Sequence, residues 1–349
     1  MALNVVALVV GLLLIWITLR DVFQSALVPR AAFSHWRVSM IQTRWLWRLW
    51  PPAAARYRDP LQREAVLATF APFNMVLLLV TWVVVTGLGY GLIFYALREQ
   101  LRPADIDFVS ALYFAGASML TIGYGDIVAI TPLARFVAVV AGATGLGIVT
   151  VVMSYLFQVV GAFGKRETFV VALSARAGTP PSGVGLLEVH GYAGAIDDLP
   201  NVLRDGQAWA AALTQTHVAN PMLTYFRSNQ GDQSWIATMA VLLDAASLVL
   251  STVDGVPHAQ ASFMLTTGRR AIHDITANRH IPPSNVEVAR HQFDAACARL
   301  TRSGYTIREP DTSWTEFCRL RRTYGAQLHA LAHYFHIPPS MWIAGHNEP

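Results

Sequence analysis

The sequence predicts an all-α membrane protein with three spanning helices, one re-entrant helix and a mainly helical cytosolic domain. The 349 residues are 54% hydrophobic and only 14% charged, with a mean hydropathy of +0.38, which is too apolar for an ordinary soluble protein. Three apolar stretches reach the roughly 20 residues of helix that a bilayer core requires. The composition then changes from Lys165 onward, which indicates a separate polar domain.

The first spanning helix is predicted within residues 1–20, in the stretch "ALNVVALVVGLLLIWITL", and Arg20 and Asp21 follow it. A cleaved signal peptide is the alternative, but it requires a positive charge before the apolar core. That charge is missing here, so we expect the helix to be retained.

Residues 21–64 form a basic, Trp-rich segment between the first two spanning stretches. Within it, "FSHWRVSMIQTRWLWRLWPP" places arginines on one face of a helix and tryptophans beside them, a pattern typical of a helix in the membrane interface. We expect Pro51 and Pro52 to end this helix. The alternative is a cytosolic helix packed on the C-terminal domain.

Residues 65–163 hold the other two spanning stretches. The second helix is expected from about Val66 to Leu97, with a kink at Pro72 and Asn74 near its inner end. After a turn at 98–107, "DFVSALYFAGASML" is too short to cross and too apolar for a solvated loop, so it is predicted to be re-entrant. The third helix is predicted at 133–163.

The arginines predict the orientation of these helices. Residues 20–63 carry eight arginines against two acids, whereas residues 98–135 carry three against four. Positive loops stay on the cytoplasmic side, so the N-terminus is expected outside and the C-terminus inside a bacterial plasma (inner) membrane.

The cytosolic part is predicted as a linker at 164–200, containing "SARAGTPPSGVG", and a helical domain at 201–349. Helical patterns occur at 206–219, 232–253, 258–279, 284–302 and 312–336. The apolar stretch "SWIATMAVLLDAASLVLSTV" is expected to be a buried core helix, because Asp244 at its centre would cost about 2.5–3.5 kcal/mol in lipid. Cys297 and Cys318, the two cysteines, are expected to be reduced core thiols.

The hexapeptide "TIGYGD", Thr121 to Asp126, lies between the re-entrant segment and the third helix. Extended backbone at membrane depth is tolerated only where protein or a water-filled path covers it. Carbonyl oxygens that all point inward can replace the hydration shell of a small cation, but this requires unusual φ/ψ values at alternate residues. Gly123 and Gly125 permit such values, which predicts a cation path lined by backbone.

This stretch closely resembles the selectivity filter of the potassium-channel pore superfamily, and the resemblance covers about residues 66–163. It implies an outer helix, a pore helix, a filter and an inner helix. The implied filter residues are Thr121, Ile122, Gly123, Tyr124, Gly125 and Asp126, with carbonyls of the first four and the Thr121 hydroxyl lining the ion sites and Asp126 at the outer mouth. Because one chain carries one filter, a homotetramer in the lipid bilayer is implied.

The inner helix carries Gly142, Gly145 and Gly147. By the resemblance, Gly145 is the candidate gating hinge, with Gly142 beside it. Close helix packing through small residues requires the same glycines, so both readings stay open.

Several positions depart from the family's usual pattern. Leu120 replaces a threonine, Ala117 replaces a frequent acid, and Tyr113 and Phe114 replace a tryptophan pair. Tyr113 keeps a polar tip that could reach Tyr124 of a neighbouring subunit. No spanning stretch carries an arginine ladder, so no voltage sensor is expected.

The expected function is therefore passive K⁺ conduction, with a cytosolic domain that regulates or assembles the pore. The alternatives are a weakly selective cation channel and a membrane-anchored sensor or scaffold with a non-conducting pore. K⁺ is the permeant ion, no cofactor and no nucleic-acid partner are expected, and an unknown cytosolic ligand is compatible with the sequence.

The cytosolic domain carries no enzyme motif. Its nearest nucleotide-site string, "SGVGLLEVHG", lacks the third glycine of a dinucleotide fingerprint. His329, His333 and His336 in "LHALAHYFHIPP" are expected on one helix face, as weak candidates for metal binding or pH sensing.

Overall fold

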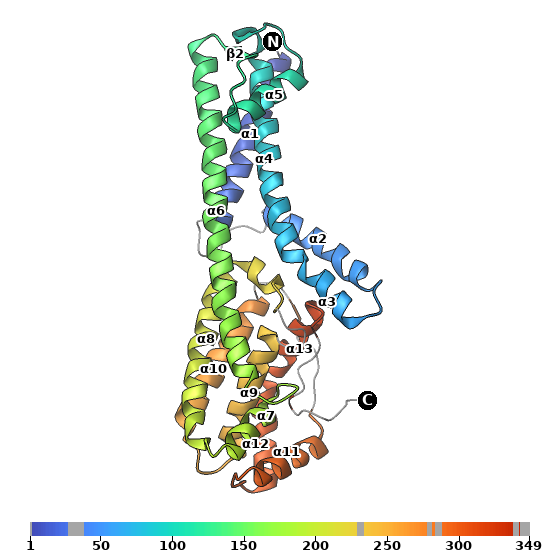
Figure 1. Ribbon diagram of the computed structural model, residues 1–349, viewed down its shortest axis with the longest axis vertical. Coiled ribbons are helices and arrows are strands. Elements are labelled where there is room, and N and C mark those ends of the chain that lie inside the picture. The colour runs from blue at the N-terminus through green and yellow to red at the C-terminus, as the bar shows by residue number, and fades with distance from the viewer. Residues whose placement is uncertain are drawn as a thin grey trace. The chain divides into compact units, whose positions relative to one another are not determined.

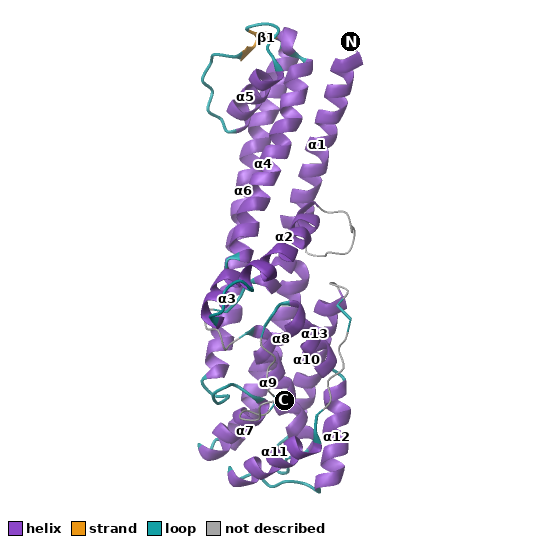
Figure 2. Cartoon of the chain, turned by 90° about the vertical axis from the view of Figure 1, so that its right-hand side faces the viewer, coloured by secondary structure: helices purple, strands orange, loops and turns teal. Residues whose placement is uncertain are grey.

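The computed structural model describes residues 2–26, 38–228, 234–277, 281–282, 288–337 and 342. The fold is all-α apart from a two-stranded ribbon (Figure 2). The chain divides into two compact units. The first comprises Met1–Arg56 and Thr69–Val160, and the second comprises Tyr57–Ala68 and Gly161–Pro349.

Three helical segments within the described residues are long and apolar enough to cross a membrane: Ala2–Ser25, Pro60–Ala96 and Pro132–Ser174. In the first unit they correspond to α1 (Ala2–Ala26), α4 (Phe70–Ala96) and the first part of α6 (Pro132–Ser174) (Figure 1). The three predicted spanning helices are thus present in the fold.

Helices α1 and α4 pack through a pair of glycines. A Cβ atom built on Gly11 would lie 2.5 Å from the Gly89 carbonyl oxygen, and one on Gly89 would lie 2.7 Å from Cγ1 of Ile15. Small residues allow this close backbone approach, which is the usual way in which spanning helices associate. The N-terminal helix is therefore packed on the outer helix of the first unit.

The predicted boundary of α1 is wrong, because the helix does not end at residue 20. It continues to Ala26, so Asp21 lies inside the helix and is only 4% exposed. The carboxylate is accommodated because neighbouring helices supply hydrogen-bond donors to it, as described below.

Helix α2 (Val38–Ala54) contains Pro51 and Pro52 rather than ending before them, which corrects the prediction. The amide of Ala55 still donates to the Pro51 carbonyl at 2.9 Å. Trp47 and Trp50 pack edge-on against Phe70, with ring centroids 4.8 and 5.5 Å away. This aromatic packing stabilises the last turn against the lost amide hydrogen bonds. The start of the predicted interfacial helix lies outside the described residues.

The second predicted spanning helix is divided at Thr69. Helix α3 (Pro60–Ala68) belongs to the second unit, and α4 starts at Phe70 in the first. Pro72 therefore occupies the first turn of α4, where its missing amide has no intrahelical acceptor to lose. The expected kink at Pro72 and Asn74 is replaced by this helix boundary.

In the second unit, α9 (Trp235–Ser251) is almost entirely buried and forms the centre of the core. Glycines on α7 (Gly183–Tyr192), α8 (Leu199–Ala219) and α10 (His258–Ala277) allow those helices to approach it. Asp244 accepts hydrogen bonds from the Tyr324 hydroxyl at 2.7 Å and from Arg321 Nε at 3.2 Å. The prediction that this apolar stretch is a core helix is confirmed.

The remaining helices are α11 (Arg290–Arg302), α12 (Pro310–Arg322) and α13 (Gly325–Tyr334). The pattern predicted at 312–336 is thus two helices, and part of the pattern at 284–302 lies outside the described residues. Burial raises the pKa of the Cys297 thiol to about 11, and burial also raises the pKa of Cys318, so both are protonated and free at neutral pH.

The expected linker at 164–200 is mostly helical. Helix α6 continues to Ser174, and α7 begins at Gly183 with Ser182 as its N-cap, whose hydroxyl accepts from the Gly185 amide at 3.0 Å. The sequence signal was misread because "SGVG" is a helix start whose glycines allow tight packing: a Cβ on Gly183 would lie 2.6 Å from Cβ of Asp244.

Candidate functional site

The segment predicted to be re-entrant forms the helix α5 (Phe108–Met119), which precedes the hexapeptide. Its N-cap, Asp107, accepts a hydrogen bond from the Ser110 amide at 2.8 Å. The helix packs on α4, where the Phe94 and Phe114 rings meet edge-on at 4.7 Å and Gly91 leaves room for Leu112. It ends at Met119, so the last carbonyls of α5, and with them the negative end of its dipole, lie next to the hexapeptide.

Two amide groups attach the hexapeptide to the end of α5. The Thr121 amide donates to the Ser118 carbonyl at 3.1 Å, and the Ile122 amide donates to the Ala117 carbonyl at 2.8 Å. Within the described part of the chain, no hydrogen bond is accepted by the carbonyls of Thr121, Ile122, Gly123 or Tyr124. These oxygens are available to a ligand that can accept lone pairs, such as a cation.

The backbone φ angles of the hexapeptide alternate between positive, left-handed values and negative ones. Thr121, Gly123 and Gly125 have φ angles of +55°, +65° and +83°, and no other residue between Leu120 and Asp126 has a positive φ. Alternation between left-handed and right-handed residues turns successive carbonyls toward the same side of an extended segment. Glycine adopts such angles without steric cost, whereas Thr121 does so at a cost of about 1–2 kcal/mol.

Side chains of the hexapeptide are exposed in the single chain, with Ile122 at 47% and Tyr124 at 67%. The Tyr124 ring stacks on Tyr113 of the same chain, with centroids 6.1 Å apart and planes 8° apart. The sequence suggested a contact from Tyr113 to a neighbouring subunit, and the structure supplies an intrachain partner for the ring.

A short ribbon holds the chain on either side of this site. Strands β1 (Leu101–Arg102) and β2 (Val128–Ala129) pair antiparallel, with Leu101 opposite Ala129. Next to the ribbon, the Thr131 hydroxyl donates a hydrogen bond to the Gln100 side chain at 2.5 Å. The same hydroxyl accepts a hydrogen bond from the Ala134 amide at the start of α6. The ribbon thus ties the turn after α4 to the segment between Asp126 and α6. Each strand has only two residues, which is too short a pattern to be read from sequence.

The glycines of α6 differ in what surrounds them. A Cβ on Gly145 would lie 2.0 Å from the Met119 carbonyl oxygen, one on Gly142 would lie 3.2 Å from the Ser118 carbonyl oxygen, and one on Gly147 would meet nothing within 4 Å. Gly145 therefore lies directly on the end of α5. Helix α6 is continuous through it, so the observed contact supports the packing interpretation, and the hinge interpretation stays a prediction.

A buried polar cluster, which the sequence analysis missed, joins α1, α2 and α4. Asp21 accepts from the Trp82 indole nitrogen at 2.8 Å, from the Ser39 amide at 3.1 Å and from the Ser39 hydroxyl at 3.0 Å. Farther along α2, the Thr43 hydroxyl accepts a hydrogen bond from the side-chain amide of Asn74 on α4 at 2.9 Å. The sequence did contain a signal for this cluster: Asp21 lies next to the predicted end of a spanning helix, and acids within a membrane nearly always have partners.

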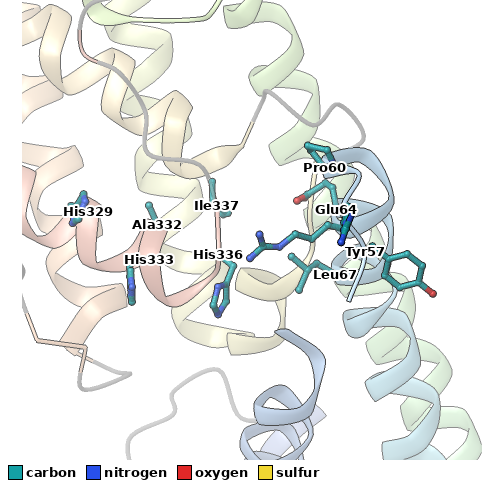
Figure 3. Close-up of a pocket in the computed structure, with 11 residues that line it drawn as sticks. Tyr57, Pro60, Glu64, Leu67, His329, Ala332, His333, His336 and Ile337 are labelled. Atoms are coloured by element: carbon teal, nitrogen blue, oxygen red, sulfur yellow. The ribbon is translucent and has the colours of Figure 1, made fainter. Parts of the chain in front are cut away.

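The histidines of the C-terminal unit do not share one helix face. His329 and His333 are on α13, but α13 ends at Tyr334 and His336 follows it with a φ of +52°. The rings of His333 and His336 are 6.4 Å apart. Among the described residues, no group of three His, Cys, Asp or Glu side chains is placed to hold a metal ion. The three histidines instead line a pocket (Figure 3).

Comparison with known proteins gives a family match that contains the hexapeptide. A family model described as "Ion channel" matches residues 77–162, which contain most of α4, all of α5, the hexapeptide and the first part of α6. The chain is also similar to YdjJ, an uncharacterized membrane protein of Bacillus subtilis, with 26% identity over 187 residues. That match covers 52% of this chain and 54% of YdjJ, so the chain spans about half the length of this relative. No solved structure matches.

The matched family is one of ion channels rather than of enzymes. Residues 77–162 are thus similar to an ion-channel domain, and they lie within an all-α chain that has three helices long and apolar enough to span a membrane and an additional helical unit.

Proposed function

We propose that the chain is one subunit of a homotetrameric channel that conducts K⁺ passively and selectively. The observation that carries this proposal is the backbone of Thr121 to Tyr124: alternate positive φ angles, anchored amides and carbonyls that accept no hydrogen bond from described residues. Removing water from a cation costs on the order of tens of kcal/mol unless other oxygens replace it. Four copies of four carbonyls supply such oxygens along one axis.

The same residues support the proposed tetramer. Extended backbone at membrane depth requires protein or water around it, and one chain leaves Ile122 and Tyr124 largely exposed. Helix α6 is also the least covered of the three spanning segments, with 17% of its apolar window buried. A closed ring of identical subunits covers these surfaces and places the carbonyls around a common path.

In this proposal the protein is a multi-pass protein of the bacterial inner membrane, with the N-terminus outside and the C-terminal unit in the cytoplasm. The arginine excess in residues 20–63 supports this orientation. Asp126 is then at the outer mouth, and its charge concentrates cations there.

The C-terminal unit is proposed to regulate the pore through α6. Arg166 on α6 is 4% exposed and donates to the Leu223 and Phe226 carbonyls at 2.9 and 2.8 Å. It also pairs with Glu167 at 2.9 Å. Because α6 is one unbroken helix from Pro132 to Ser174, the segment that contacts α5 at Gly145 is continuous with the segment fixed by Arg166.

The test is ion flux into liposomes that contain the purified protein, with K⁺ or Na⁺ as the only permeant cation. The Gly123→Ala variant places a side chain at a φ of +65°, whereas Gly147→Ala adds the same methyl group to an open position on α6. We expect K⁺ flux to exceed Na⁺ flux, and we expect Gly123→Ala, but not Gly147→Ala, to lose this difference. Equal fluxes of the two ions in the wild type would indicate a weakly selective cation pore instead.

A further inference from the structure

The C-terminal unit contains an open pocket of about 490 Å³ between α13 and the segment 57–67 (Figure 3). All its lining residues belong to this unit, because Tyr57–Ala68 is part of it. The volume lies within the range of small-molecule sites, roughly 300–1,000 Å³. Its lining carries two arginines, one acid and three histidines: Arg58, Arg63, Glu64, His329, His333 and His336.

The acid in this set is already neutralised. Arg227 binds both carboxylate oxygens of Glu64, at 2.6 and 2.7 Å, and its other nitrogen donates to the carbonyls of Phe335 and His336. Arg227 therefore connects α3 to the C-terminal end of α13, where a positive charge also interacts favourably with the helix dipole. A bidentate pair of this kind leaves little negative charge in the pocket.

Among the described residues, the two arginines of the lining have no such compensation. Neither Arg58 nor Arg63 takes part in an ion pair among the described residues, and both side chains are exposed. His329, His333 and His336 add three imidazoles to the lining of the pocket. The pocket thus gathers two arginines and three histidines around one acid whose charge is already balanced.

The pKa of His336 reflects the positive charge in the pocket. Its pKa is lowered from 6.5, first by burial and then by the positive charges of Arg63, His333 and Arg227. Burial also lowers the pKa of Arg227, which the carboxylate of Glu64 partly offsets. A bound anion would relieve the repulsion at His336 and raise its pKa again.

We propose that this pocket binds a small, soluble, phosphate-bearing anion of at most about nucleotide size. Arginine forks match the oxygens of a phosphate group, and several cations around one space favour a ligand with more than one negative charge. Glu64 is kept from repelling such a ligand by its pair with Arg227. Because residue 68 is followed at once by Thr69 and α4, ligand binding would act on the segment that leads into the outer helix. This regulatory consequence rests on the proposed function, whereas binding itself does not.

The test is isothermal titration calorimetry of inorganic pyrophosphate into the full-length protein in neutral detergent and phosphate-free buffer. We expect saturable binding that weakens about tenfold or more in Arg63→Gln and Arg58→Gln, since each loses a charged hydrogen-bond donor. The control is Arg269→Gln, which removes an exposed arginine of α10 outside the pocket and is expected to bind as the wild type does. Unchanged melting temperatures exclude misfolding as the cause of lost binding.

Protonation gives a second readout. Affinity is expected to rise as the pH falls from 7.5 to 6, at most about tenfold per pH unit for one proton taken up. The comparison with His336→Gln removes the contribution of the ligand's own protonation. The groups that face this imidazole are Arg63, Arg227 and His333.

Three outcomes overturn the proposal. One is the absence of pyrophosphate binding to the wild type, and another is equal binding in Arg63→Gln, Arg58→Gln and the wild type. The third comes from a parallel titration with a short-chain phosphatidic acid: binding of this lipid without binding of pyrophosphate would assign the pocket to a membrane headgroup. Loss of binding with normal K⁺ flux, or the reverse, separates this proposal from the proposed function.

Discussion

The contact between Gly145 and the end of α5 leads to a graded prediction for three glycines on one helix. Replacing Gly145 by Ala would place a Cβ atom 2.0 Å from the Met119 carbonyl oxygen, at least about 1 Å closer than real Cβ contacts allow. The obstacle is backbone and cannot rotate away. The same change at Gly142 would place the atom at 3.2 Å, and at Gly147 it would meet nothing within 4 Å.

The magnitude follows from two terms. Overpacking of this kind costs about 1–3 kcal/mol, whereas Gly→Ala in a helix interior gains up to about 1 kcal/mol at every one of the three positions. The gain cancels when the variants are compared with one another. We therefore expect Gly145→Ala to be about 1–3 kcal/mol less stable per subunit than Gly147→Ala, with Gly142→Ala between them.

The assay is the melting temperature of each purified variant in detergent, followed by its open probability in bilayers. The packing interpretation expects the melting temperature to fall in the order Gly147→Ala, Gly142→Ala, Gly145→Ala. If Gly145→Ala melts together with Gly147→Ala but opens less often than the wild type, the packing argument is refuted. The residue would then act as a hinge.

Three further predictions concern buried polar groups and pH. Asp21→Leu would leave donors from Trp82 and Ser39 unpaired, at about 1–3 kcal/mol each, so its melting temperature should fall below that of Asp21→Asn; equal values would contradict the observed network. Arg166→Gln would leave the buried Glu167 carboxylate unpaired at a cost of about 3–5 kcal/mol, and thermal denaturation should show recovery when Glu167→Gln is added; no recovery would contradict the pairing. The pKa of His336 in the folded protein lies below 6.5, so as the pH falls the unfolded chain takes up this proton before the folded protein does. The free energy of unfolding should therefore be highest above pH 6.5 and fall as the pH drops through the folded pKa. Denaturant titrations should show a shallower fall in His336→Gln, and parallel curves for the two proteins would refute this.

The spanning helices and the core helix α9 could be predicted because each depends on a local pattern. Apolar length determines whether a helix can cross a bilayer, and Asp244, with the many Ala, Ser and Thr residues around it, indicated that α9 belongs to a protein core. The left-handed angles at Gly123 and Gly125 were likewise foreseen, because glycines at alternate positions of an extended segment have few other uses.

Features that depend on tertiary contacts could not be predicted in this way. The sequence suggested that α1 ends near Asp21 and that α2 ends at Pro51, since it does not reveal that Trp82 and Ser39 bind the acid or that Phe70 packs on the last turn of α2. The pairing of Glu64 with Arg227 is equally invisible, because it joins residues 163 positions apart. That pairing joins α3, which lines the pocket of the C-terminal unit, to the residues that follow α13.

The central claim is that the carbonyls of Thr121 to Tyr124 form a K⁺-selective path. The most direct test is the reversal potential of the purified protein in planar bilayers, with K⁺ on one side and Na⁺ on the other. We predict a value near the potassium equilibrium potential, which Gly123→Ala moves toward zero while Gly147→Ala does not. A wild-type current that reverses near zero would contradict the claim.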